Sequence, residues 1–223
     1  MEVTISKRAE DILCKERDRK NPVETAKMFL REMLEPSPDR FDMTYRYEHS
    51  LRVAENARFI AKEENLPEEP LVIAGLLHDV GYRECRTMEE LSHHPEISAE
   101  FARLFLENIG YDPAFSVKIV KGIRYHDCTD NFPEDMDAFE MSVRDADDID
   151  RYDIIRFATG LRDDVDEKSH EEIIAACCRE KDKLNWFRAL KRGTGTARKM
   201  IDDIYKKRIA FYDEIIKQAG KGF

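Results

Sequence analysis

The sequence predicts an all-α fold, on three observations. Nearly every segment repeats its apolar residues at intervals of three and four, the spacing that places them on one face of a helix. No segment alternates apolar and polar residues around a hairpin turn signal, as an antiparallel strand pair would. Residue types that start and stop helices also recur at the ends of the periodic segments. A helical bundle is therefore the expected architecture.

The apolar periodicity predicts ten helices. They span residues 4–18, 22–35, 45–65, 69–79, 95–109, 112–127, 136–150, 152–161, 168–191 and 197–219. Asn21 before Pro22 fits an N-cap followed by proline at the first helical position, as does His94 before Pro95. Gly110 follows a predicted helix end, where glycine is favoured. These signals support three boundaries, which belong to two of the helices.

Length and charge limit the classes of protein to which the chain can belong. A length of 223 residues with 42% hydrophobic content suits a single domain with a continuous core. A net charge of −10 disfavours binding to a nucleic acid polymer, whereas a small phosphorylated molecule stays compatible because a metal can neutralise it locally. The longest apolar run, residues 71–77, is far too short to span a bilayer. We therefore expect a cytoplasmic protein with no membrane partner.

Side chains that bind metals recur on the apolar faces of separate helices. His49 shares a helix face with Val53 and Ala57, so its imidazole is expected to point inward. His78 ends the most apolar helix of the chain, and Asp79 follows it immediately. A carboxylate in that position would be costly to bury without a partner.

The same pattern returns further along the chain. His126 continues an apolar stripe that includes Ile123, Asp145 lies on the stripe of Ile149, and His94 stands at the start of another amphipathic helix. A single inward histidine is more often a hydrogen-bonded core residue than a ligand. Several imidazoles and carboxylates buried together without a partner would each cost a few kcal/mol, ~1–3 by mutational measures. A divalent cation such as Mn, Fe, Co, Ni, Zn or Mg would resolve that cost.

Three segments resemble the motifs of the HD-domain metal-dependent phosphohydrolase superfamily. They are YEHSLRV at 47–53, AGLLHDVG at 74–81 and VRDADDID at 143–150. The resemblance covers roughly residues 45–155 and implies a helical fold with metal-assisted hydrolysis of phosphomonoesters or phosphodiesters. It also implies that His49, His78, Asp79 and Asp145 hold one metal ion.

Two further segments resemble the extra histidines of the two-metal branch of this superfamily. In that branch Asp79 would bridge both ions, and the second ion would add His94 and His126 as ligands. With one ion, these two histidines would instead contact the substrate or orient other ligands. His93, adjacent to the better-matching His94, is expected at the surface or behind the ligands.

The resemblance also divides the predicted single domain, residues 1–223. Residues 45–155 are expected to form the HD-type metal-binding core, and residues 156–223 a C-terminal helical extension packed on it. That extension either closes the site or provides a face for a homodimer, and the sequence does not distinguish the two. The loop 191–196, with two glycines before a helix-start threonine, could bind an anion, although a capped hinge between the last two helices fits its spacing better.

Cationic residues near the expected ligands are candidates for binding a substrate phosphate. They are Arg46, Arg83, Lys121 and Arg124. Arg83 is the first choice, because it lies at the open end of the helix that carries His78 and Asp79, although each could be an ordinary solvated charge. Asp127, beside His126, is a candidate general acid or an orienter of an imidazole. Asp79, Arg83 and Asp127 are thus the expected catalytic residues.

The predicted function is metal-dependent hydrolysis of a phosphate ester on a small molecule, a nucleotide or another phosphometabolite, by one or two divalent ions. Two alternatives stay open. The same six ligands would suit a di-iron oxygenase, which needs two irons and consumes oxygen. A non-catalytic ligand sensor would instead contain a structural metal.

Overall fold

A computed structural model describes residues 6–17, 19–35, 42–129, 132–155 and 169–222, and every regular element in these ranges is helical. The elements are α1 (Lys7–Leu13), α2 (Pro22–Met33), α3 (Asp42–Glu64), α4 (Glu68–Leu77), the 3-10 helix η1 (Tyr82–Glu84), α5 (Met88–Ser92), α6 (His94–Ile109), α7 (Pro113–Arg124), α8 (Ala138–Tyr152), α10 (His170–Ala189), α11 (Gly195–Ala219) and the 3-10 helix η2 (Gly220–Gly222). The predicted all-α fold is confirmed. None of the described helices has the length and apolar character needed to cross a membrane.

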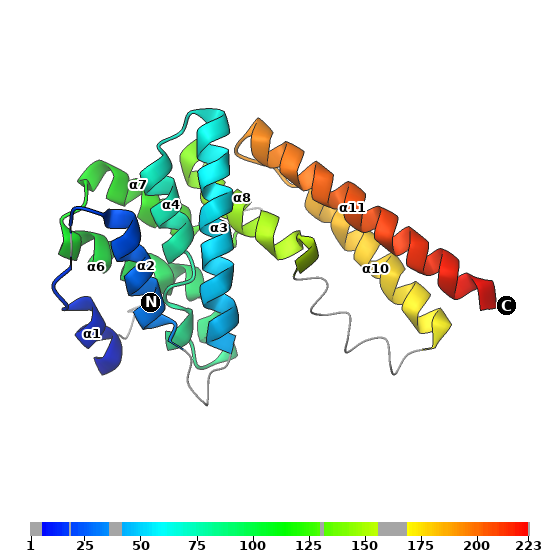
Figure 1. Cartoon of the computed structure of the whole chain (residues 1–223), viewed down its shortest axis with the longest axis horizontal. Helices are drawn as coiled ribbons and strands as arrows, with labels where there is room; N and C mark the ends of the chain where they lie inside the picture. The colour runs from blue at the N-terminus through cyan, green and yellow to red at the C-terminus, as the bar shows by residue number, and fades with distance from the viewer. Residues whose placement is uncertain (1–5, 18, 36–41, 130–131, 156–168, 223) are drawn as a thin grey trace.

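Figure 1 shows two parts, a bundle that contains α1 to α8 and a long hairpin of α10 and α11 that projects from one side of it. Most of the predicted helices are present with shifted ends, and the short η1 and α5 occupy the gap predicted between residues 79 and 95. The predicted helix 152–161 lies mostly outside the described residues. Asn21 caps α2 as predicted, but the N-cap of α6 is His93. His94 is therefore the first residue of α6, and its ring is free to point into the bundle.

The helix α4 is the centre of the bundle, because all its residues from Pro70 to Leu77 are buried. It packs closely against α3 at Gly75, where a Cβ atom would lie 2.9 Å from the Cα of Ala54. Only glycine permits such a close approach of two helix backbones. This contact sets the distance between His49 on α3 and His78 at the end of α4.

The hairpin is attached to the bundle through buried charges. Arg192, in the loop between α10 and α11, lies over the ring of Phe187 and has its Nη1 2.5 Å from Asp148 Oδ2 and 3.4 Å from Asp145 Oδ1. Arg192 is 8% exposed, and Asp145 is fully buried. Burial raises the pKa of Asp145 to about 6, even though Arg192 and the N–H of Gly193 favour the carboxylate.

The loop 191–196 does bind anionic groups, but those of its own chain. The N–H of Gly193 donates to Asp145 Oδ2 at 2.7 Å, and the N–H of Thr196 donates to Glu64 Oε1 at 2.6 Å. The Thr194 hydroxyl accepts from the N–H of Ala197 and so caps α11. The structure therefore supports a capped hinge rather than a site for an external anion.

We expect Arg192→Ala to destabilise the protein strongly. The substitution removes the guanidinium partner of Asp145 and leaves Asp148 with Arg144 alone. Loss of one partner of a buried ion pair typically costs about 3–5 kcal/mol. Urea unfolding followed by circular dichroism would measure the loss. Lys191→Ala, at the exposed neighbouring position, is the matched control and should change the free energy of unfolding by less than about 0.5 kcal/mol. A loss under about 1 kcal/mol for Arg192→Ala would show that these charges do not hold the hairpin.

Candidate metal centre

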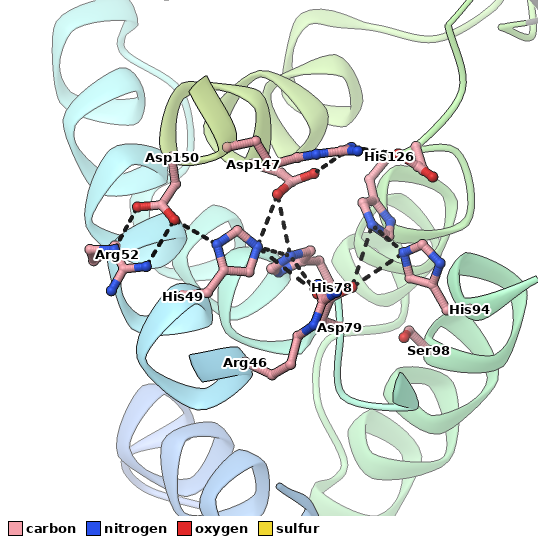
Figure 2. A network of polar contacts seen from close by, with 12 residues as sticks. Arg46, His49, Arg52, His78, Asp79, His94, Ser98, His126, Asp147 and Asp150 are labelled. Atoms are coloured by element: carbon pink, nitrogen blue, oxygen red, sulfur yellow. Dashed lines mark hydrogen bonds and ion pairs between the residues drawn. The ribbon is translucent and has the colours of Figure 1, made fainter. Parts of the chain in front are cut away.

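Four histidines and two aspartates from separate parts of the sequence converge inside the bundle (Figure 2). They are His49 on α3, His78 and Asp79 after α4, His94 at the start of α6, His126 after α7 and Asp147 on α8. The side chain of His94 is 12% exposed, and those of the other five are at most 3% exposed. Five of these six residues were predicted as ligands.

Two histidine pairs face the two oxygens of Asp79. On one side, Nε2 of His49 and Nε2 of His78 are 3.2 Å apart, and they lie 3.9 Å and 3.6 Å from Asp79 Oδ2. On the other side, Nε2 of His94 and Nε2 of His126 are 3.3 Å apart, and they lie 3.3 Å and 3.7 Å from Asp79 Oδ1. Asp79 therefore stands where a bridging ligand would.

The hydrogen bonds of three rings turn their ε nitrogens into acceptors. Nδ1 of His78, His94 and His126 each lies 2.7–2.8 Å from a backbone carbonyl oxygen. Because a carbonyl oxygen can only accept, each Nδ1 must donate its proton, and the neutral ring then offers a lone pair at Nε2. Burial lowers the pKa of all three histidines, which keeps them neutral.

His49 is held differently, by a carboxylate. Its Nδ1 lies 2.6 Å from Asp150 Oδ2, and Arg52 fixes that carboxylate with Nε at 2.6 Å and Nη2 at 3.1 Å. Its Nε2 lies 3.0 Å from Asp147 Oδ1. Burial lowers the pKa of His49, but Asp147 and Asp150 outweigh it and raise the pKa to about 9. A carboxylate behind a histidine is the usual way in which proteins orient a metal ligand.

These residues fit a divalent cation. Oδ1 of Asp79 is buried and has no hydrogen-bond partner. It faces the Nε2 lone pairs of His94 and His126, so acceptors point at an acceptor across a shared space. Imidazoles and carboxylates together suit Mn, Fe, Co, Ni or Zn, and a cation would satisfy all of these groups at once. One group of potential ligands lies at His49, His78 and Asp79, another at Asp79, His94 and His126, and a third at His78, His126 and Asp147.

Asp147 stands in the place predicted for Asp145, and the structure corrects the prediction. Two residues along a helix correspond to about 200°, so these two side chains leave α8 on nearly opposite faces. Asp147 points to the histidines, together with Asp150, whereas Asp145 points to Arg192 and Gly193. The sequence offered no way to choose, because both faces of α8 are buried.

A polar pocket of about 170 Å³ opens beside the centre. Its lining residues are Arg46, Asp79, Tyr82, Leu91, His94, His126, Asp127, Asp147 and Arg151. Nη1 of Arg46 lies 2.8 Å from Asp79 Oδ2, and its guanidinium lies 3.6 Å from the centroid of the Tyr82 ring. Burial opposes the ionisation of Asp79, but the charge of Arg46 holds the pKa of this carboxyl group well below the ordinary value.

The pocket contains some of the predicted substrate residues and lacks others. Arg46 and Asp127 line it, as expected. Arg83 instead binds the carbonyl oxygen of Glu35, and Lys121 and Arg124 line a separate groove along α7. His93 lies at the surface with its side chain 44% exposed. Arg151 lines the pocket and was not predicted, because nothing in its local sequence distinguishes it from the other arginines.

We expect Asp147→Asn to reduce metal binding and Asp145→Asn to preserve it. Asp147 offers a carboxylate oxygen to the converging imidazoles, whereas Asp145 is engaged by the 191–196 loop. Metal content after dialysis against a defined Mn²⁺ concentration would compare the two variants. Equal loss in both variants would contradict the assignment of Asp147.

Metal affinity should rise with increasing pH, up to a pH of about 9. A cation must displace the proton that Asp147 and Asp150 hold on His49, so affinity increases up to about tenfold per pH unit below the pKa of His49 and flattens above it. Competition with a chelator at pH 6 to 9 would measure this slope. Asp150→Asn removes one of the charges that raise the pKa, so its curve should flatten at lower pH. The same curve in both proteins would contradict the role of Asp150.

Comparison with known proteins agrees with this geometry. Residues 46–155 match the family model of the HD domain, a stretch that contains all six converging residues. The fold is similar to the crystal structure of a predicted HD superfamily hydrolase from an uncultured Thermotogales bacterium, with a TM-score of 0.63 and 24% sequence identity. That similarity covers 87% of this chain and 91% of the other. No curated protein matches the chain. The chain carries an HD domain at residues 46–155.

Proposed function

We propose that this protein is a metal-dependent hydrolase that cleaves a phosphate ester of a small molecule, such as a nucleotide. The observation that carries the proposal is the pair of histidine groups joined by Asp79 beside a pocket that contains two arginines. The HD domain at residues 46–155 supports metal-dependent hydrolysis in general. The two arginines favour an anionic substrate.

The ligand set would hold one or two divalent ions, and Asp79 belongs to two of the three groups of potential ligands. Ions of this kind supply two things in hydrolases, neutralisation of phosphoryl charge and acidification of water. The backbone carbonyls behind His78, His94 and His126 fix the imidazole rings, and Asp150 does the same for His49. The chain thus orients all four imidazoles before any ligand binds.

The size and polarity of the pocket favour the phosphoryl group as the part of the substrate that it accommodates. At about 170 Å³ the pocket is smaller than the ~300–1,000 Å³ of sites that enclose a whole drug-sized ligand. Arg46 lies against one wall, stacked on Tyr82, and its guanidinium can donate to oxyanions. The rest of the substrate would then lie outside the pocket.

We expect the Mn²⁺-loaded protein to release phosphate from at least one member of a broad panel of phosphate esters. His78→Ala and His94→Ala each remove an imidazole from the centre, so either should reduce the rate by at least about a hundredfold, the upper figure for losing a residue that merely orients a ligand. Phosphate release measured colorimetrically would test this.

His93→Ala is the matched control, because His93 precedes His94 but faces the surface. Its rate should equal that of the unaltered protein. The proposal fails if metal-loaded protein releases no phosphate from any ester of the panel. Oxygen consumption by iron-loaded protein in the same assay would point to the oxygenase alternative.

A further inference from the structure

Arg151 lies at the exposed side of the metal-centre pocket and has two carboxylate partners. Its Nη1 lies 2.5 Å from Asp127 Oδ1 and 3.5 Å from Asp147 Oδ2. On α8 it follows Asp147 by one turn, which places both side chains on the same helix face. The arginine therefore reaches the pocket from the same element that directs Asp147 at the histidines.

The contact between Arg151 and Asp127 is easy to exchange. The two side chains are 37% and 40% exposed, and water screens an ion pair of this exposure so that it contributes little to stability. The other arginine of the pocket differs, because Arg46 is 18% exposed and its partner Asp79 is 2% exposed. Of the two guanidiniums, that of Arg151 can therefore change partner at the smaller cost.

The charges of the pocket indicate which new partner Arg151 would take. Three carboxylates, those of Asp79, Asp127 and Asp147, face the guanidiniums of Arg46 and Arg151, which leaves one negative charge in excess. One divalent ion would reverse that sign, and a second would leave a larger positive excess. A planar guanidinium also matches the oxygens of a phosphoryl group in a bidentate contact.

We propose that Arg151 binds the phosphoryl group of the substrate and that Asp127 is its resting partner, a carboxylate that the phosphoryl group displaces. The inference rests on the proposed function and adds a residue to it. It gives Asp127 a role different from the general acid or imidazole orienter expected from the sequence. Asp127 competes with the phosphoryl group for Arg151, and the substrate must displace this exposed carboxylate, while Asp147 lies further from the guanidinium, at 3.5 Å.

Binding of inorganic phosphate to the Mn²⁺-loaded protein tests this by isothermal titration calorimetry. Arg151→Gln should weaken phosphate binding about ten- to a hundredfold, the range for losing hydrogen bonds to a charged group. Asp127→Asn should tighten it about two- to fivefold, because a competing exposed ion pair is removed. Both substitutions break the same ion pair, so a purely structural role of the pair would move both affinities in the same direction.

Two controls keep the result interpretable. Arg124→Gln removes a guanidinium from the separate groove along α7 and should leave phosphate affinity unchanged. Metal content is measured for every variant, since Arg151 also contacts Asp147. Arg151→Lys retains a cation beside Asp147, and we expect its phosphate affinity to lie between those of the unaltered protein and Arg151→Gln.

The outcomes separate this inference from the proposed function. Unchanged phosphate affinity in Arg151→Gln, or a shift of Arg151→Gln and Asp127→Asn in the same direction, overturns the role of Arg151 even if the protein cleaves phosphate esters. Opposite shifts support it. If the unaltered metal-loaded protein neither binds inorganic phosphate nor releases it from any ester, the proposed function fails together with the inference.

Discussion

The carboxylate of Asp79 is ionised although it is almost wholly shielded from water, and the arrangement of the bundle follows from this constraint. A buried anion that has lost its partner destabilises a fold by about 3–5 kcal/mol. Arg46 satisfies one of its oxygens, and the second oxygen has no hydrogen-bond partner. The four imidazoles arranged around it present lone pairs rather than N–H groups in at least three cases, so protein groups alone do not compensate the charge. A cation is a group that would compensate this charge, which is why we propose that the chemistry of the protein takes place here.

The helix α8 links this centre to the C-terminal hairpin. One of its faces directs Asp147, Asp150 and Arg151 at the centre and its pocket, and the other carries Asp145 and Asp148, which engage the 191–196 loop. Burial disfavours the charged carboxylates on both faces of α8, and on each face a separate set of partners compensates this cost. The hairpin is thus more than an appendage, since its loop neutralises carboxylates on the helix that also supplies part of the candidate site. A rotation of α8 would disturb both sets of contacts together.

The two arginines of the pocket have different physical situations. Arg46 is stacked on Tyr82 and bound to Asp79, so it neutralises a buried charge and keeps a fixed orientation. Arg151 is more exposed and contacts two carboxylates, those of Asp127 and Asp147. Arg46 therefore stabilises the centre, whereas Arg151 can exchange a carboxylate partner for a ligand. This division would let the pocket bind an oxyanion without loosening the carboxylate that lies between the two histidine groups.

The sequence by itself determined the helical fold and five of the six converging residues. His49 and His126 could be identified because each continues an apolar stripe, and His78-Asp79 because it ends the most apolar helix of the chain. His94 could be identified because it starts another amphipathic helix, and the family motifs then placed it among the ligands. The choice between Asp145 and Asp147 required the tertiary structure, because periodicity shows which residues are buried but cannot distinguish two buried faces of one helix. The same limit hid Arg151, whose environment comes from Asp127, 24 residues away. The 191–196 loop is a further case: its free N–H groups suggested an anion, and only the packing of the hairpin decided that the anions are Asp145 and Glu64 of the same chain.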